Sequence, residues 1–176
     1  MAKKKFMVDV LSKSSIEKLK EDLLKYQSEL QAKTWELCQT LAEQGVEIAK
    51  ARIATYDAIF TGELLSSIRA ENRGEDGDKA VFVMVADSRH AVFVEFGTGQ
   101  IGEEAAYPYP FPEGIQWDYN SGKTIFEVAP GEYGWFYPRD GKWYFTQGMP
   151  SRPFMYETSL GLQEIVVKTA KEVFEK

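Results

Sequence analysis

The sequence predicts an α+β fold, with a long N-terminal helix and a C-terminal helix packed on a small, mainly antiparallel sheet. Apolar residues recur every three or four positions toward both ends of the chain, as in amphipathic helices. Between these stretches, short apolar segments with period-two alternation are bounded by turn-forming residues, as in strands. The length of 176 residues fits a single domain with one core.

Composition narrows the classes of function. Hydrophobic residues make up 44% and charged residues 27% of the chain, so it can bury a core. The formal net charge of -6 argues against direct binding of nucleic acid, which needs clustered Lys and Arg. No stretch approaches the roughly 18 to 20 apolar residues of a membrane span, and no apolar signal segment follows Lys3–Lys5. We therefore expect no nucleic-acid or membrane partner and synthesis that ends in the cytoplasm.

Residues that could carry chemistry are sparse. Cys38 is the single cysteine and lies between two leucines at helical spacing, so we expect a small core residue and not a reactive thiol. Asp87, Ser88 and His90 are the residue types of a hydrolase triad, but their crowding into one turn favours a polar turn. Because His90 is the only histidine, a histidine-rich zinc site is excluded. We predict no catalytic residue, metal or cofactor.

The N-terminal third predicts a short strand and then one long helix. Alternation over residues 6–10 indicates an edge strand, and Ser14 with Glu17 has the spacing of a capping box at a helix start. Helical periodicity then continues over about residues 15–55, or roughly 60 Å at 1.5 Å per residue, which exceeds the width of a small domain. Either a bend near Gly45 or an extension that packs on a neighbouring subunit would accommodate this length.

The middle of the chain predicts three consecutive antiparallel strands. A turn and a short apolar segment over residues 61–68 lead into residues 69–73, and the cluster at 75–78 marks a tight reversal. Alternating valines predict a strand over residues 81–85, and a second apolar run predicts another over residues 91–96.

Residues 100–147 form an insertion in which Gly and Pro punctuate a dense series of aromatic residues. Asp140-Gly141 predicts a hairpin turn between strands at residues 131–137 and 142–146. A terminal helix is expected over about residues 153–175, where proline suits the first turn. The insertion is either a minor core of its own or a surface that faces a partner, and the sequence leaves both interpretations open.

Three sequence motifs occur in a characteristic order along the chain. Thr61-Gly62-Glu63-Leu64-Leu65-Ser66-Ser67-Ile68 follows the long helix, Val94-Glu95-Phe96-Gly97-Thr98-Gly99 ends the last predicted strand before the insertion, and Met149-Pro150-Ser151-Arg152-Pro153-Phe154 opens the final helix. Together they resemble the phage head-tail joining or tail-completion family, whose members typically read TG-x-L-x-x-SI, VEFGTG and PARPFL at these places. The chain departs from that pattern in its longer, more aromatic insertion, in Met155-Tyr156, and in lacking a basic, proline-containing stretch before Thr61.

The resemblance implies a structural component of a tailed phage or prophage particle that acts at the head-tail junction or in tail completion. It implies a ring-like homo-oligomer, with neighbouring head-closure, tail-terminator or tail-tube proteins as partners and no enzyme activity. The protein would assemble in the host cytoplasm and end in the virion. A binding module that recognises a peptide or glycan through the aromatic insertion is the alternative, and a small enzyme with an acidic site is a more distant one.

We expect the interaction residues in two groups. They are the residues of the second and third motifs (Glu95, Phe96, Gly97, Thr98, Gly99, Arg152, Pro153 and Phe154) and three tryptophans of the insertion (Trp117, Trp135 and Trp143). Strand alternation would turn Glu95 toward solvent or another subunit, and a buried Glu95 would need a partner such as Arg152. Gly97-Thr98-Gly99 lacks a full phosphate-binding pattern, so we favour a tightly packed strand end.

Overall fold

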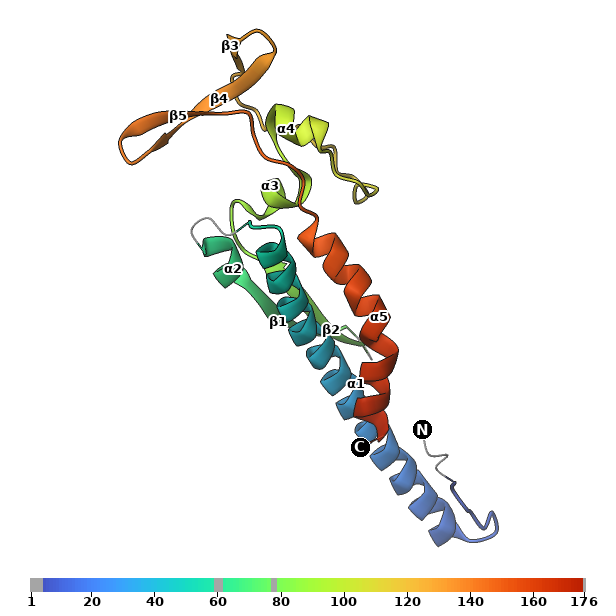
Figure 1. The fold of residues 1–176 in the computed structure, drawn as a ribbon. Coiled ribbons are helices and arrows are strands. Elements are labelled where there is room, and N and C mark those ends of the chain that lie inside the picture. The colour runs from blue at the N-terminus through green and yellow to red at the C-terminus, as the bar shows by residue number, and fades with distance from the viewer. Residues whose placement is uncertain (1–4, 59–61, 77–78, 176) are drawn as a thin grey trace. The chain divides into compact units, whose positions relative to one another are not determined.

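The computed structural model describes residues 5–58, 62–76 and 79–175 and contains five helices and five strands within them (Figure 1). In chain order these are α1 (Lys13–Thr55), α2 (Glu63–Ser67), β1 (Ile68–Asp76), β2 (Lys79–Ala86), α3 (Ala91–Phe96), α4 (Gly99–Glu104), β3 (Phe126–Ala129), β4 (Glu132–Arg139), β5 (Lys142–Thr146) and α5 (Phe154–Glu175). β1 pairs with β2, and β3-β4-β5 form a separate antiparallel sheet. The predicted α+β class is confirmed.

The described residues fall into two compact units, and α1 and α5 contribute to both. The first unit contains α1 up to Glu47, residues 69–85 and α5 from Leu160 onward. The second contains residues 48–68 and 86–159. That the whole chain is one domain stays a prediction.

In the first unit, α1 packs against β2 and α5. The rings of Trp35 and Phe82 meet edge to face with centroids 5.0 Å apart. A Cβ at Gly45 would lie 3.1 Å from Leu162 Cδ1, so the missing side chain admits α5. The helix continues through Gly45 without interruption. This glycine therefore serves close helix packing and does not end the helix.

Polar contacts also join the two helices of the first unit. Lys33 Nζ donates to the carbonyl oxygens of Val173 and Phe174 at 3.2 and 3.3 Å, which satisfies the C-terminal end of α5. Thr169 Oγ1 hydrogen-bonds to Gln44 Oε1 at 3.1 Å. Cys38 is half-buried and forms no disulfide, so it lies at the edge of the core.

The predicted N-terminal strand is wrong. Residues 5–12 contain no strand, and the ring of Phe6 instead packs against Tyr26 of α1 at 5.8 Å. Alternation alone does not make a strand, because a strand needs a partner to bond its backbone. The helix cap also differs from the prediction: the amide of Ser15 donates to Ser12 Oγ at 3.3 Å, and Ser15 Oγ accepts from the Asp9 amide.

The predicted strand over residues 91–96 is also wrong, because these residues form helix α3. A six-residue apolar run fits a buried strand and a buried helix equally well, so tertiary contacts decided between them. The predictions over residues 69–73 and 81–85 are confirmed as parts of β1 and β2. Of the predicted turns, Thr61 and residues 77–78 lie outside the described residues.

The hairpin of the insertion and the terminal helix are confirmed. β4 and β5 pair from Trp135 opposite Thr146 to Arg139 opposite Lys142. Asp140 and Gly141 have φ values of 50° and 73°, as a two-residue turn of type I′ requires. Within the described part of the chain, no helix combines the length and apolar character that crossing a membrane requires.

Candidate functional site

The second and third motifs meet at the start of α5. The amide of Thr98 donates to the Met149 carbonyl, and the Met149 amide donates to the Thr98 carbonyl, both at 2.9 Å. The Arg152 amide donates to the Val94 carbonyl at 2.8 Å, and Ser151 Oγ donates to the Glu95 carbonyl at 2.7 Å. These four bonds join two segments about fifty residues apart into one structure, which we call the α3–α5 junction (residues 93–99 and 149–158).

The glycines of the second motif are required by this close approach. Gly97 and Gly99 have φ values of 80° and 66°, where L-residues with side chains are strained. A Cβ at Gly99 would lie 2.2 Å from the Gln147 carbonyl oxygen, and one at Gly97 would lie 2.7 Å from the Ser151 nitrogen. The amides of Gly97, Thr98 and Gly99 donate to carbonyls of the chain itself, so they are not directed at a phosphate. The expected packed corner is present, at the end of a helix and not of a strand.

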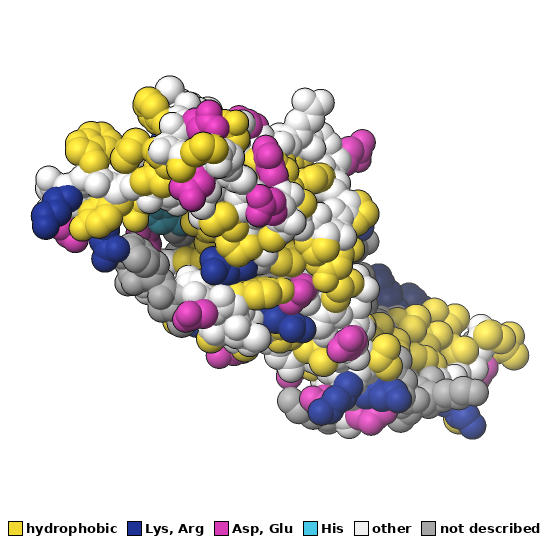
Figure 2. Space-filling view, turned by 45° about the horizontal axis from the view of Figure 1, so that its top comes forward, with side chains coloured by type: hydrophobic (Ala, Val, Ile, Leu, Met, Phe, Trp, Pro, Cys, Tyr) yellow, Lys and Arg dark blue, Asp and Glu magenta, His cyan; other side chains and the backbone are white. Residues whose placement is uncertain are grey.

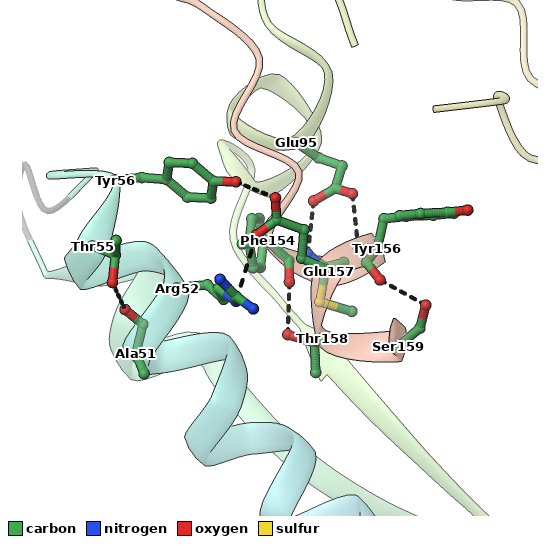
Figure 3. Close-up of polar contacts among 11 residues, drawn as sticks. Ala51, Arg52, Thr55, Tyr56, Glu95, Phe154, Tyr156, Glu157, Thr158 and Ser159 are labelled. Atoms are coloured by element: carbon green, nitrogen blue, oxygen red, sulfur yellow. Dashed lines mark hydrogen bonds and ion pairs between the residues drawn. The ribbon is translucent and has the colours of Figure 1, made fainter. Parts of the chain in front are cut away.

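Glu95 caps the first turn of α5 (Figure 3). Its Oε2 accepts from the Met155 amide at 2.8 Å, and its Oε1 accepts from the Tyr156 amide at 3.1 Å. Amides in the first turn of a helix lack partners within the helix, and the helix dipole favours a negative charge there. A carboxylate from a distant segment thus satisfies two backbone donors.

The expectations for Glu95 were wrong in both forms. Glu95 is 7% exposed, and its neighbours Val94 and Phe96 are buried with it. Strand alternation therefore does not apply, because α3 is helical. Arg152 is half-buried and, among the described residues, makes no ion pair with Glu95. Backbone amides take the place of the predicted guanidinium.

Burial dominates the electrostatics of Glu95. Desolvation raises the pKa of this carboxyl above its ordinary value of 4.5, and the negative charge of Glu157 acts in the same direction. The hydrogen bonds from the two α5 amides and from Tyr107 oppose this increase only in part. Burial, followed by the charge of Glu95, raises the pKa of Tyr107 to about 12.

Glu157 links the same turn of α5 to the end of α1 (Figure 3). Tyr56 Oη donates to Glu157 Oε1 at 2.6 Å, and Arg52 Nε lies 3.5 Å from Glu157 Oε2. Burial, together with the hydrogen bond to Glu157, raises the pKa of the Tyr56 hydroxyl above its ordinary value. The first turn of α5 is therefore held from two sides, by Glu95 of α3 and by residues near the end of α1.

The first half of the insertion completes the junction with aromatic rings. The ring of Phe96 has Tyr107, Phe111 and Trp117 around it, with centroid distances of 4.9, 5.4 and 5.1 Å. Trp117 Nε1 donates to the Gly97 carbonyl at 2.9 Å, so its indole is also satisfied. Tyr107 and Trp117 thus form a small aromatic core with Phe96, and Phe111, which is 38% exposed, lies at its edge.

Comparison with known proteins assigns a family. A family model described as "Bacteriophage HK97-gp10, putative tail-component" matches residues 10–97, half of the chain. The chain belongs to the HK97-gp10-like family. Searches of curated proteins and of solved structures gave no match. The matched segment runs from the residues before α1 to Gly97 and therefore ends before the insertion and α5.

Membership makes this gp10-like chain a structural phage protein of the tail, which implies a place in the virion and contacts with other phage structural proteins. The match includes Glu95, Phe96 and Gly97 of the junction. The α5 amides that bond to Glu95 and the insertion rings that surround Phe96 lie outside the matched segment. The resemblance noted at the motifs is thus confirmed at the level of the family.

The second half of the insertion in the gp10-like chain differs from the first. In the β3–β5 sheet (residues 126–146), Trp143 is 70% exposed. Six more of its large side chains are exposed, namely Phe126, Val128, Tyr133, Phe136, Tyr137 and Tyr144. Figure 2 shows apolar side chains, in yellow, at the surface of the molecule. The two halves of the insertion therefore differ: rings of the first half pack around Phe96, whereas the sheet presents exposed apolar side chains. That this exposed surface faces a partner stays a prediction.

The three predicted tryptophans do not come together. Trp117 belongs to the aromatic core, Trp135 is half-buried beside Gly99, and Trp143 is exposed. Pro153 and Phe154 are buried at the start of α5. Their assignment as interaction residues stays a prediction, and only Trp143 among the three tryptophans is largely accessible.

The polar turn before α3 has the structure expected of a turn. Ser88 Oγ accepts from the His90 amide at 3.2 Å and donates to Glu63 Oε1 at 3.3 Å. The serine hydroxyl is thus bonded to a backbone amide and to a carboxylate of α2. This arrangement is that of a local turn and not of a nucleophile and its base.

Proposed function

We propose that the protein acts at the head-tail junction or in tail completion, by self-assembly and by contacts with neighbouring phage proteins and not by catalysis. The observation that carries this proposal is the exposed aromatic surface of the β3–β5 sheet. Tyr, Trp and Phe are enriched in protein interfaces and often dominate their binding energy. A hairpin with a two-residue turn presents these rings on a defined backbone.

The chemistry of the sheet supports a protein partner. The ring of Phe136 lies near the rings of Phe126 and Phe145 on one face, with centroid distances of 5.8 and 5.3 Å, and Tyr137 lies near Tyr144 on the other. Apolar side chains on both faces cannot all be covered by one layer of the chain's own residues. β3 and β5 are also edge strands, whose backbone groups can pair with another chain.

Self-assembly is supported by a second exposed apolar region, which lies in the first unit. This region is made of exposed residues that precede α1 or lie in its N-terminal part, namely Met7, Val10, Leu11, Leu23 and Leu24. Two different apolar surfaces on one chain allow a head-to-tail contact between identical subunits, and such a contact closes into a ring when its rotation permits. We propose that these residues and the sheet take part in subunit contacts.

Light scattering over a wide concentration range tests self-assembly. We expect a closed oligomer of the wild type and a smaller mass for Trp143→Lys and for Leu24→Lys. Val167→Lys is the matched control, because Val167 of α5 is also exposed, at 63%, but belongs to neither surface. An oligomer that neither variant weakens would contradict the assignment of these surfaces.

Incorporation into particles tests the phage role. In a phage that lacks its own copy of this gene, we expect the wild type and Val167→Lys to restore tailed particles and Trp143→Lys to fail. Full restoration by Trp143→Lys would contradict the proposed role of the sheet. A wild type that stays monomeric and binds neutral sugars through the sheet would favour the alternative of a glycan-binding module.

A further inference from the structure

A depression of about 520 Å³ lies beside α4 and the β3–β5 sheet, within the second unit. Six residues give it its chemistry: Gln100, Glu103, Glu104, Asn120, Tyr133 and Trp135. Two of these are aromatic rings, two are carboxylates and two are amides. No Lys or Arg contributes to its lining among the described residues. The depression is therefore a cavity with aromatic walls and only negative formal charge.

The floor of this depression is held rigidly by Gln100. Its Nε2 donates to Glu104 Oε1 and to the Gly131 carbonyl, both at 3.1 Å. Its Oε1 accepts from the Tyr133 amide at 3.1 Å and from Gln147 Nε2 at 3.2 Å. With four bonds made, Gln100 orients α4 and β4 and is not itself available to a ligand. The walls are thus placed before anything binds.

The two carboxylates that line the depression differ in their hydrogen bonding. Glu104 is oriented by Gln100, whereas Glu103 is exposed and has no hydrogen-bond or ion-pair partner within the described part of the chain. A third carboxylate, Glu127, lies directly across from Tyr133 on the neighbouring strand, and its charge raises the pKa of the Tyr133 hydroxyl. Two carboxylates and two rings therefore line the depression, and Glu127 adds a third negative charge beside Tyr133.

We propose that this depression binds an arginine side chain presented by a segment of another protein. A guanidinium group is planar and can stack on the face of Trp135 or Tyr133 while it donates to a carboxylate. The same walls would repel a carboxylate or phosphate ligand. The exposed position of Glu103 leaves an acceptor for the charge-assisted hydrogen bonds that arginine forms. This proposal does not depend on the phage role or on self-assembly.

The test uses the full chain labelled with 5-fluorotryptophan, whose four indole signals are followed by fluorine NMR. The probe is the capped peptide acetyl-Gly-Arg-Gly-amide, and its matched control carries citrulline, which has nearly the same shape without the charge. Trp135→Phe assigns the signal of Trp135. We expect the arginine peptide to shift that signal in a saturable way and the citrulline peptide to bind at least tenfold more weakly.

Two variants, one in the depression and one away from it, then distinguish arginine binding at this site from a general attraction to the negative charge of the protein. Glu103→Gln with Glu104→Gln should weaken arginine binding at least tenfold, whereas Glu113→Gln, an exposed acid in the same unit, should leave it unchanged. Equal binding of the citrulline peptide, equal binding by the double variant, or shifts confined to the other tryptophans would each overturn the proposal. Unfolding midpoints of the variants exclude loss of fold. Self-assembly is tested separately by light scattering, so a negative result for arginine binding would not contradict the proposal that the protein self-assembles.

Discussion

The α3–α5 junction and the β3–β5 sheet are both built around aromatic residues from the insertion, yet they use those residues in opposite ways. At the junction, rings surround Phe96, and the Trp117 indole and the Glu95 carboxylate have partners within the chain. In the sheet, Trp143 and its neighbours face solvent. The difference shows that aromatic content alone does not mark an interface, since satisfied polar groups and buried rings belong to structure, whereas exposed rings on a defined backbone are available to a partner.

The largest expected effect is at the junction, from Gly99→Ala. The new Cβ would meet the Gln147 carbonyl oxygen at 2.2 Å with φ at 66°, so the backbone must shift. We expect a loss of about 4 kcal/mol or failure to fold, measured as the free energy of unfolding in urea. Gly114→Ala is the matched control, because Gly114 also has positive φ, at 80°, with nothing within 4 Å. It should cost only about 1 kcal/mol, and equal losses would remove the steric explanation.

Next in size is Glu95→Ala, which removes the acceptor of the partly buried amides of Met155 and Tyr156. We expect a loss of about 2 to 3 kcal/mol in the free energy of unfolding, because unsatisfied buried donors keep their full desolvation cost. Glu172→Ala serves as the control, since Glu172 and its ion pair with Lys168 are exposed, and it should change stability by less than about 0.5 kcal/mol. A loss at Glu95 no larger than at Glu172 would contradict the capping role.

The Glu95 carboxylate also makes the free energy of unfolding depend on pH. Its folded-state pKa is raised above 4.5, so the folded state holds the proton more tightly than the unfolded state. The corresponding stability is present in full below about pH 4.5 and is lost as the pH rises through the folded-state pKa. Unfolding curves from pH 4 upward should therefore show the wild type losing stability relative to Glu95→Gln across that window. A difference that stays constant with pH would mean that Glu95 does not titrate in this way.

A smaller effect is expected for Tyr56→Phe, which removes the 2.6 Å hydrogen bond to Glu157 but keeps the ring. The free energy of unfolding should fall by about 1 kcal/mol. The control is Tyr144→Phe, because Tyr144 is exposed in the sheet and its hydroxyl can bond to water in both states. If both substitutions had the same effect, the bond between the end of α1 and α5 would contribute nothing measurable.

The smallest effect on stability should come from the sheet. Trp143→Ser removes a ring that is 70% exposed, so the free energy of unfolding of the isolated chain should change by no more than about 0.5 kcal/mol. Assembly should nonetheless be weakened, as light scattering would show. A large loss of stability with normal assembly would place Trp143 with the structural aromatic residues and would end the contrast between the two regions.

Local signals in the sequence determined a large part of this protein. Helical periodicity predicted α1 and α5 to within about two residues, and Asp140-Gly141 placed the turn of the β4–β5 hairpin. These signals depend on residues that are close together in the sequence, so they can be interpreted without the rest of the chain. The motifs carried the family resemblance for the same reason, because they are read directly from the order of residues.

Tertiary structure alone decided the rest. Residues 91–96 could form a strand or a helix, and contacts with the start of α5 favour the helix that brings Glu95 to the amides of Met155 and Tyr156. Those amides are sixty residues away, and no local pattern marks a backbone donor that lacks a partner. The division of the insertion into a buried core and an exposed sheet was likewise open in the sequence, because burial depends on which distant segments return to cover a ring.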